Sequence, residues 1–150
     1  MKITICGSLV FSDKMSEAKE QLEKEKHEVR LPLLEVEDEK GNIISAKKYH
    51  TIRKTANAGE TWVWDRKEEA MRIHFDNVVW ADAILILNYH KNNIPNYIGA
   101  NTLIEMGLAF YHKKKIFLLN PVPNISYKEE VLAMKPIIIN NNFELINQMV

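Results

Sequence analysis

Cysteine is nearly absent from the sequence, and neither sign of charge is in excess. Cys6 is the single cysteine, which excludes an internal disulfide, and we interpret it as a small buried hydrophobic residue at a strand end. Lysine plus arginine number 20, as do aspartate plus glutamate, so the formal net charge is +0. This balance lacks the basic excess that draws proteins to polyanions, and we expect no nucleic acid polymer as a partner.

Long apolar runs and the common cofactor motifs are also missing. No apolar run is long enough to span a bilayer, and residues 1–6 enter a predicted strand without a cleavable signal, so we expect a cytoplasmic protein without a membrane partner. Neither the G-x-G-x-x-G dinucleotide fingerprint nor the G-x-S-x-G elbow of serine hydrolases occurs. The 5 histidines lack the paired spacing of zinc sites, which predicts no metal and no cofactor.

What the sequence does contain is an alternation of short apolar runs with helical patterns, over a length of 150 residues that fits one domain, residues 1–150. The predicted strands are residues 2–6, 28–31, 83–87, 115–119 and 136–139, and the predicted helices are residues 12–26, 66–80, 126–134 and 143–149. Ser12 and Asp65 are the predicted N-caps of the first two helices. The alternation predicts an α/β fold with a doubly wound five-stranded parallel sheet, flavodoxin-like or Rossmann-like, in the order 2-1-3-4-5.

The segment from Pro32 to Asp65 is an insertion after the second strand. It contains an acidic patch, a turn at residues 40–42 and a basic run at residues 47–54. One interpretation is a solvated, mobile loop. The other is a functional, partly helical segment, because loops of this length in small domains are rarely without structure or function. We expect a helical lid over residues 45–56.

A central motif runs from Ile98 to Ala109, where a predicted loop turns into a helix. Glu105 stands there among apolar neighbours, which is unusual for a solvated carboxylate. One explanation is structural, because Thr102-x-x-Glu105 has the spacing of a capping box at a helix start. The other is functional, namely a carboxylate held beside a glycine-lined floor that a ligand can approach. The two explanations are compatible.

The residues Asn101-Thr102-x-x-Glu105-x-Gly107-x-Ala109, followed by Lys114-Lys115-Ile116-Phe117, resemble the nucleoside 2-deoxyribosyltransferase superfamily, which includes the 2'-deoxynucleoside 5'-monophosphate N-hydrolases. The resemblance covers the first strand and about residues 72–120. It implies that Glu105 is a nucleophile that attacks the anomeric carbon of a deoxyribose. The expected activity is therefore cleavage or transfer of the N-glycosidic bond of a 2'-deoxyribonucleoside or its 5'-monophosphate.

The same resemblance implies roles for other residues. Asp82 matches an acid of the superfamily and is our candidate for protonating the departing base. Gly99 stands where relatives carry an Asp or a Ser that selects the nucleoside or the nucleotide. The expected substrate-binding residues are Gly7 and Ser8 of the first loop, Asn88 or Asn101 as a replacement polar contact, Tyr89 or Tyr97 to orient the nucleophile, and Gly99 with Thr102.

The expected partner is a small-molecule nucleoside or nucleotide. Relatives complete their sites across subunits, and the insertion carries Tyr49, Trp62 and Trp64, so we also expect a homo-oligomer. An alternative from a different class is a non-catalytic nucleotide sensor of the same fold, and a purely structural oligomer is a third.

Overall fold

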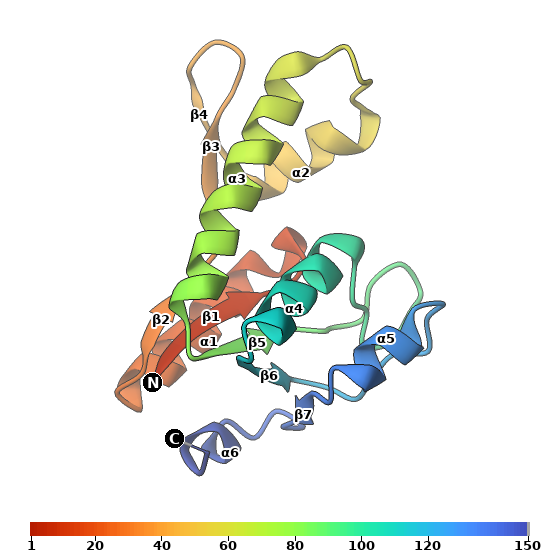
Figure 1. The fold of residues 1–150 in the computed structure, drawn as a ribbon. Coiled ribbons are helices and arrows are strands. Elements are labelled where there is room, and N and C mark those ends of the chain that lie inside the picture. The colour runs from red at the N-terminus through yellow and green to blue at the C-terminus, as the bar shows by residue number, and fades with distance from the viewer. Residues whose placement is uncertain (150) are drawn as a thin grey trace.

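The computed structural model describes residues 1–149, and these form a parallel sheet with helices on both faces (Figure 1). Its strands are β1 (Lys2–Cys6), β2 (Glu28–Arg30), β5 (Ala83–Ile86), β6 (Lys115–Leu118) and β7 (Ile137–Ile138). Within the described residues the sheet is 5-stranded in the order β2-β1-β5-β6-β7, and every neighbouring pair is parallel. The predicted fold and the order 2-1-3-4-5 are confirmed, with strand ends within two residues of the predicted ones.

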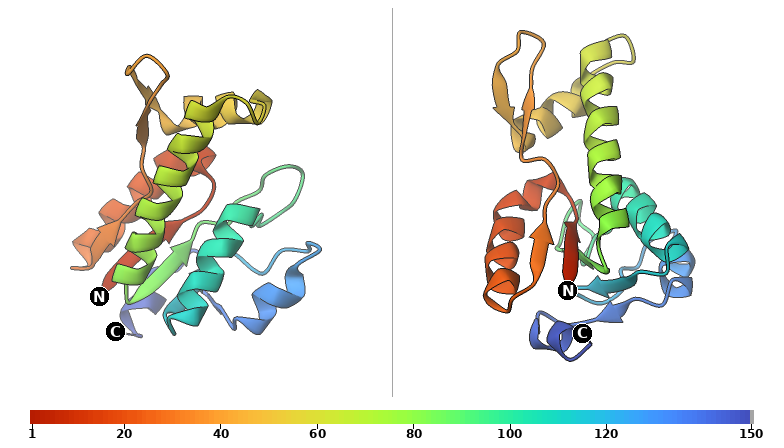
Figure 2. Two further views of the ribbon diagram at one scale, coloured as in Figure 1. Left: turned by 45° about the horizontal axis from the view of Figure 1, so that its top comes forward. Right: turned by 60° about the vertical axis from the view of Figure 1, so that its left-hand side comes forward.

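Two apolar layers cover the two faces of the sheet, because the central strands alternate buried side chains to both sides. Ile3 and Leu85 face α1 (Ser12–Lys24) and α6 (Glu144–Asn147). Ile84 faces the other layer, formed by α3 (Thr61–Trp80), α4 (Ala100–Tyr111) and α5 (Lys128–Ala133). Figure 2 shows α1 and the α3–α4 pair on opposite sides of the sheet. A doubly wound sheet of this kind leaves its carboxyl edge free for a ligand.

The predicted helix starts are wrong at two places. A 3-10 turn at Leu9–Phe11 precedes α1, so Ser12 is the first helical residue and not the cap. The α3 helix begins at Thr61, which leaves Asp65 exposed inside the helix. The α3 helix buries Val63, His74 and Val78, whereas Ile73 is 37% exposed and Val79 is 42% exposed.

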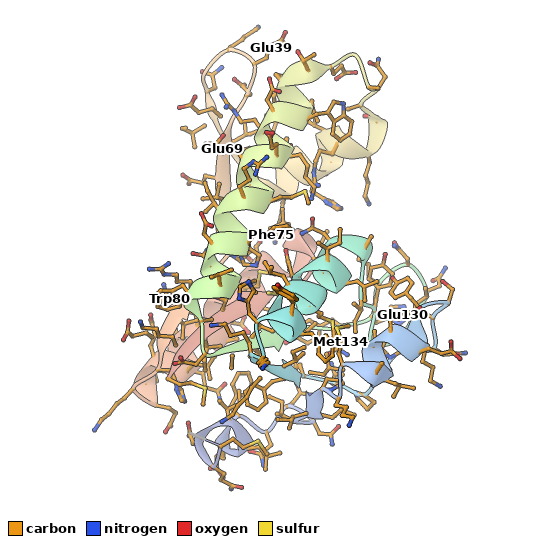
Figure 3. All side chains as sticks on the ribbon, viewed as in Figure 1. Glu39, Glu69, Phe75, Trp80, Glu130 and Met134 are labelled. Carbon is orange, nitrogen blue, oxygen red and sulfur yellow. The ribbon has the colours of Figure 1, made fainter. Side chains whose placement is uncertain are left out.

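The carboxyl-terminal end of α3, from Asn77 to Trp80, is anchored to the sheet. The Thr4 hydroxyl donates to the Asn77 carbonyl at 2.7 Å, and the Asn77 side-chain amide donates to the Leu31 carbonyl at 3.3 Å. The Arg30 guanidinium lies 3.9 Å from the ring centroid of Trp80, which Figure 3 places at the end of α3. With this end held by a buried polar network and a cation–π contact, the rest of the long helix projects beyond the sheet.

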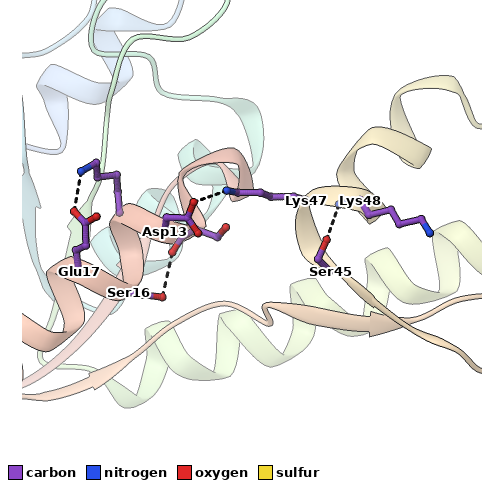
Figure 4. Close-up of polar contacts among 8 residues, drawn as sticks. Asp13, Ser16, Glu17, Ser45, Lys47 and Lys48 are labelled. Atoms are coloured by element: carbon purple, nitrogen blue, oxygen red, sulfur yellow. Dashed lines mark hydrogen bonds and ion pairs between the residues drawn. The ribbon is translucent and has the colours of Figure 1, made fainter.

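The insertion consists of the antiparallel hairpin β3 (Glu35–Glu37) and β4 (Ile43–Ser45), followed by α2 (Ala46–Thr55). It has its own apolar cluster, made of Val36, Ile44, Tyr49 and Val63. The hairpin was not predicted, because each strand has three residues and buries one of them, which is too little alternation to recognise. The predicted helical lid is confirmed, and the Ser45 hydroxyl caps it by accepting from the Lys48 amide (Figure 4).

The insertion stands beside the free half of α3, above the sheet (Figure 1). The Lys47 ammonium pairs with the Asp13 carboxylate at 2.7 Å, so α2 is linked to α1 (Figure 4). This exposed pair contributes little energy, but His50 and Arg53 of α2 line the same cavity as Gly7 after β1. The helical lid therefore faces the carboxyl ends of β1 and β5.

The aromatic residues of the insertion give weaker support to self-association than the sequence indicated. Tyr49 is 1% exposed, and its hydroxyl donates to the Val63 carbonyl within the same chain. Trp64 is 37% exposed, and its ring nitrogen donates to the Asn57 carbonyl at 2.9 Å. The homo-oligomer stays a prediction. No helix within residues 1–149 has an apolar stretch long enough to cross a membrane.

Candidate active site

A cavity of about 210 Å³ lies between the sheet and the insertion. Its floor consists of the loop after β1 and the start of α4, and its walls are α2, the middle of α3 and the loop before α4. This is the carboxyl edge of β1 and β5, the strands between which the winding of the sheet reverses. Of the predicted site residues, the cavity brings together Gly7, Ser8, Tyr97, Gly99, Asn101, Thr102 and Glu105.

Glu105 is the most unusual of these residues, because its carboxylate is only 2% exposed. Asn101, one helical turn earlier, donates its side-chain amide to Glu105 Oε1 at 2.7 Å. Oε2 is buried and has no hydrogen-bond partner among the described residues. Burial raises the pKa of Glu105 to about 7, although the Cys6 thiol and the Lys67 ammonium counteract part of that rise.

The capping-box explanation of Glu105 is wrong. The α4 helix begins at Ala100 with Gly99 as its N-cap, and no side chain caps it. Thr102 therefore lies inside the first turn of α4. It is 5% exposed and lines the cavity. The carboxylate of Glu105 points back along the helix to Asn101 instead of to a backbone amide. A carboxylate in this position needs another reason to be buried.

Lys67 connects α3 to this carboxylate through Asn101. Its ammonium donates to Asn101 Oδ1 at 3.1 Å, and the Asn101 amide in turn donates to Glu105. Burial, with the nearby Arg53 charge, lowers the pKa of Lys67 to about 8, and the carboxylate opposes that shift. The chain of contacts fixes which oxygen of Glu105 is engaged and leaves Oε2 free.

Positive charge lines the rest of the cavity. Lys91 donates to the Ser8 hydroxyl at 2.7 Å, and Arg53 donates to His50 Nδ1 at 3.0 Å. Burial and the surrounding cations lower the pKa of His50 to about 4, so this ring is neutral at pH 7. Within residues 1–149, Arg53, Lys67 and Lys91 form no ion pair with an acidic side chain, and the buried Arg53 Nε has no acceptor. An anionic ligand would satisfy these groups.

Two further residues approach Glu105, and neither was predicted to be a site residue. His74 on α3 is 4% exposed, and its Nε2 lies 3.8 Å from Glu105 Oε2. Burial lowers the pKa of His74 to about 4, so the ring is neutral at pH 7. Cys6, at the end of β1, is fully buried and offers its sulfur within 4.8 Å of ligand atoms of both residues.

One signal for these missed residues was present in α3. Its inward stripe contains Val63, Lys67, Ala70, His74 and Val78, at intervals of three or four residues. Polar residues in the middle of an otherwise apolar stripe indicate a helix that leaves the core and borders a site. The cationic residues of α2 and of the loop after β5 gave no such signal, because only the tertiary fold brings them together.

Asp82 lies outside the cavity. It precedes β5, at the amino edge of the sheet, whereas the cavity is at the carboxyl edge. The side chain is exposed, and its Oδ2 accepts from the Lys2 amide at 2.8 Å. The prediction that Asp82 protonates a departing base is therefore wrong, because one strand length separates it from the cavity.

Asn88 and Tyr89 also have other roles. The buried Asn88 amide donates to the carbonyls of Asn120 and Pro121 at 3.0 and 3.2 Å, and its Oδ1 accepts from the Asn120 amide at 2.9 Å. Tyr89 packs edge-on against Phe11, with ring centroids 5.2 Å apart. Neither residue lines the cavity, so the predicted substrate contacts are wrong, and Asn88 is a fastener between two loops.

We expect Asn88→Ala to lower the free energy of unfolding by about 2–4 kcal/mol, because it leaves several buried backbone groups without partners. Urea unfolding measures this loss. The matched control is Asn124→Ala, at an exposed asparagine, which should change stability by less than about 0.5 kcal/mol. Equal losses of stability in the two variants would contradict the role of Asn88 in linking the two loops.

The fold and the cavity define a doubly wound α/β protein with a cavity at the switch point of its sheet, where proteins of this architecture bind ligands. Among solved structures, the chain is similar to the CMP N-glycosidase BcmB of Clostridium botulinum, with 13% identity over 99% of this chain and 98% of that chain and a TM-score of 0.47. No protein-family model and no curated protein matches the sequence. So distant a likeness carries no functional argument, and the proposals below depend on the geometry of this chain.

Proposed function

We propose that the protein cleaves the N-glycosidic bond of a 2'-deoxynucleoside 5'-monophosphate, with Glu105 as the nucleophile. The observation that carries this proposal is the buried carboxylate of Glu105, whose Oε2 has no hydrogen-bond partner among the described residues and which lines a cavity whose other charged side chains are cationic. The sequence motif around Glu105 resembles that of deoxyribosyltransferases and nucleotide N-hydrolases, which supports the same role and the deoxyribose.

In this reaction Glu105 Oε2 attacks C1' as the bond from C1' to the base breaks, through an oxocarbenium-like transition state, and the base leaves with the bonding electron pair and takes a proton from solvent. The product of this step is an ester between Glu105 and the sugar. Water then attacks C1', which releases 2-deoxyribose 5-phosphate, returns one proton to solvent and returns the carboxylate, whereas attack by a second base would transfer the sugar. A carboxylate held in a water-poor site stabilises the developing positive charge more strongly than one in solvent.

The cations favour a phosphorylated substrate over a free nucleoside. Lys67 is engaged with Asn101 beside the nucleophile, which leaves Arg53 and Lys91 for an anionic group on the sugar. Charge-assisted hydrogen bonds from arginine and lysine are the usual contacts of a phosphate. Gly7 and Ser8, at the end of β1, line the part of the cavity where we place the sugar. Gly7 has φ +154 and a Cβ there would meet the Leu87 carbonyl at 3.1 Å, so this turn favours glycine.

A second candidate function is nucleotide binding without cleavage, and the lack of a second carboxylic acid among the described residues that line the cavity supports it. Glu105 is the one carboxylate that lines the cavity among residues 1–149, so no carboxylic acid is positioned to protonate the leaving base. A protein that binds the nucleotide without cleaving it needs no such group. Incubation with deoxynucleoside monophosphates and their ribose counterparts, followed by chromatography for free base and calorimetry for binding, separates the candidates. Base release supports the hydrolase, and saturable binding of intact nucleotide supports the sensor.

The pH dependence of base release tests the protonation state of the Glu105 carboxyl group. The nucleophile is the carboxylate form, so we expect kcat/KM to rise about tenfold per pH unit up to about pH 7 and then to level off. The substrate phosphate also titrates near pH 6, so the control is the free deoxynucleoside, whose slower cleavage should show the same acid limb. An acid limb near pH 4.5 with both substrates would contradict a buried, ionising Glu105.

A further inference from the structure

Three buried side chains from three separate elements converge beside the cavity. Cys6 comes from the end of β1, His74 from α3 and Glu105 from α4. Their sulfur, nitrogen and oxygen atoms lie within 4.8 Å of one another, and His74 Nε2 is 3.8 Å from Glu105 Oε2. None of the three residues is more than 4% exposed. The sequence did not predict this cluster, because 68 and 31 residues separate its members, by subtraction of their numbers.

Three polar atoms of this cluster lack hydrogen-bond partners among the described residues. Both ring nitrogens of His74 and Glu105 Oε2 are buried without a hydrogen bond. Buried polar atoms in native proteins are nearly always paired, and each exception needs an explanation such as an ion. His74 Nε2 and Glu105 Oε2 face one another at 3.8 Å, so a single ion placed between them would satisfy these two atoms.

We propose that Cys6, His74 and Glu105 form a binding site for one thiophilic divalent cation, best matched by Zn²⁺, whose occupancy blocks the nucleophile. Thiolate, imidazole and carboxylate together are ligands typical of zinc, whereas Mg²⁺ and Ca²⁺ prefer oxygen ligands alone. Three protein ligands leave a fourth position of a tetrahedral ion open. Since His74 and Glu105 border the cavity, that position faces the cavity, where water completes the coordination.

The distances fit after a small closure. Zn²⁺ lies about 2.3 Å from sulfur and about 2.0–2.2 Å from nitrogen or oxygen, so ligand atoms in a tetrahedral site are roughly 3.3–3.6 Å apart. The observed separations, which are at most 4.8 Å and are 3.8 Å between His74 Nε2 and Glu105 Oε2, therefore need to shrink by no more than about 1.5 Å. Binding converts the Cys6 thiol to a thiolate, and the proton passes to solvent.

The consequence for activity rests on the proposed function. Glu105 Oε2 cannot both coordinate a cation and attack C1', so a bound Zn²⁺ removes the nucleophile without covalent change. Because the Asn101 amide holds the other oxygen, rotation of the carboxylate does not free a replacement. We therefore expect Zn²⁺ to inhibit base release reversibly and a chelator to restore it.

The test uses Co²⁺ as a spectroscopic substitute for Zn²⁺ in the purified full chain. Cys6 is the single cysteine, so a thiolate-to-cobalt absorption band in the near ultraviolet identifies its sulfur as a ligand. We expect this band with wild-type protein, together with the visible bands of tetrahedral Co²⁺, at one ion per chain. Addition of Zn²⁺ should remove them. Cys6→Ser should abolish the near-ultraviolet band, and His74→Gln should weaken binding at least about 100-fold.

The matched control is His112→Gln, at an exposed histidine, which should bind Co²⁺ like the wild type. Absence of the near-ultraviolet band in wild-type protein would overturn the site, and so would Co²⁺ binding that Cys6→Ser leaves unchanged. If Cys6→Ser does not fold, the wild-type band and His74→Gln still decide the question. A rise of about 5–10 °C in the unfolding temperature with Zn²⁺, lost in His74→Gln, is a second readout.

Activity measurements separate this site from the proposed function. If the protein gives the cobalt spectrum but releases no base from any nucleotide, the metal site is supported and the hydrolase proposal is rejected. If the protein releases base but gives no cobalt spectrum, only the metal site is rejected. An active protein that gives the spectrum but is not inhibited by Zn²⁺ at saturation overturns the blocking of Glu105.

Discussion

Replacing Glu105 with glutamine should lower the rate of base release at least about a thousandfold, or about 4 kcal/mol in the barrier. Glutamine keeps the size of the side chain and the acceptor for the Asn101 amide, but it carries no charge with which to attack C1'. The same substitution should raise the free energy of unfolding at pH 8 by about 1–3 kcal/mol, because the wild-type protein must keep a buried carboxylate ionised. Lower activity with higher stability is the combined signature of a functional residue.

The sign of the stability change depends on pH. Burial raises the pKa of Glu105 to about 7 from an ordinary value of 4.5, so the folded state retains a proton that the unfolded chain releases. Wild-type stability should therefore fall as pH rises from about 4.5 to about 7, and the glutamine variant should show no such loss. The control is Glu129→Gln on α5, at an exposed glutamate, which should leave both measurements unchanged. A Glu105→Gln protein that keeps most of the base-releasing rate would contradict the covalent mechanism.

Removing two cations from the cavity should separate nucleotides from nucleosides. The double variant Arg53→Gln/Lys91→Met should lower kcat/KM for a deoxynucleoside monophosphate by at least about 150-fold, because two charge-assisted contacts to a phosphate, at about 1.5–3 kcal/mol each, contribute at least about 3 kcal/mol together. The rate with the free deoxynucleoside should change by less than about threefold, since that substrate has no phosphate to bind. Steady-state kinetics with matched substrate pairs measure the difference.

Lys48→Met provides the control, because Lys48 lies on the same helix as Arg53 but is exposed and outside the cavity. It removes one positive charge from the same helix and should leave kcat/KM unchanged for both the nucleotide and the nucleoside at physiological salt. An equal loss for nucleotide and nucleoside in the double variant would show that Arg53 and Lys91 support the fold of the cavity and do not select a phosphate.

The sheet could be predicted from the sequence because its central strands bury both faces. The β5 and β6 strands read as continuous apolar runs, and the alternation with helices determines the parallel order. The hairpin of β3 and β4 could not be predicted, because its six residues bury only Val36 and Ile44. Its stability comes from packing on Tyr49 and Val63, contacts that exist only once α2 and α3 are in place.

The candidate site was predictable where it follows strand ends and unpredictable where it depends on tertiary packing. Glu105 and the loop of Gly7 and Ser8 could be placed because parallel strands end at one edge of the sheet. Asp82 was misplaced because a residue just before a strand lies at the opposite edge. His74 was not predicted as a site residue because a lone histidine in a helix is more often structural, and its place in the inward stripe of α3 was the one sign against that interpretation.

The most direct test of the account is the mass of the intact protein during turnover. Rapid acid quenching of wild-type protein with a saturating deoxynucleoside monophosphate should trap a fraction of the chain with the added mass of a 2-deoxyribose 5-phosphate residue, on a peptide that contains Glu105. Glu105→Gln should show no adduct. Base release by the wild-type protein with no adduct at any quench time, or with an adduct on another residue, would contradict the assignment of Glu105 as the nucleophile.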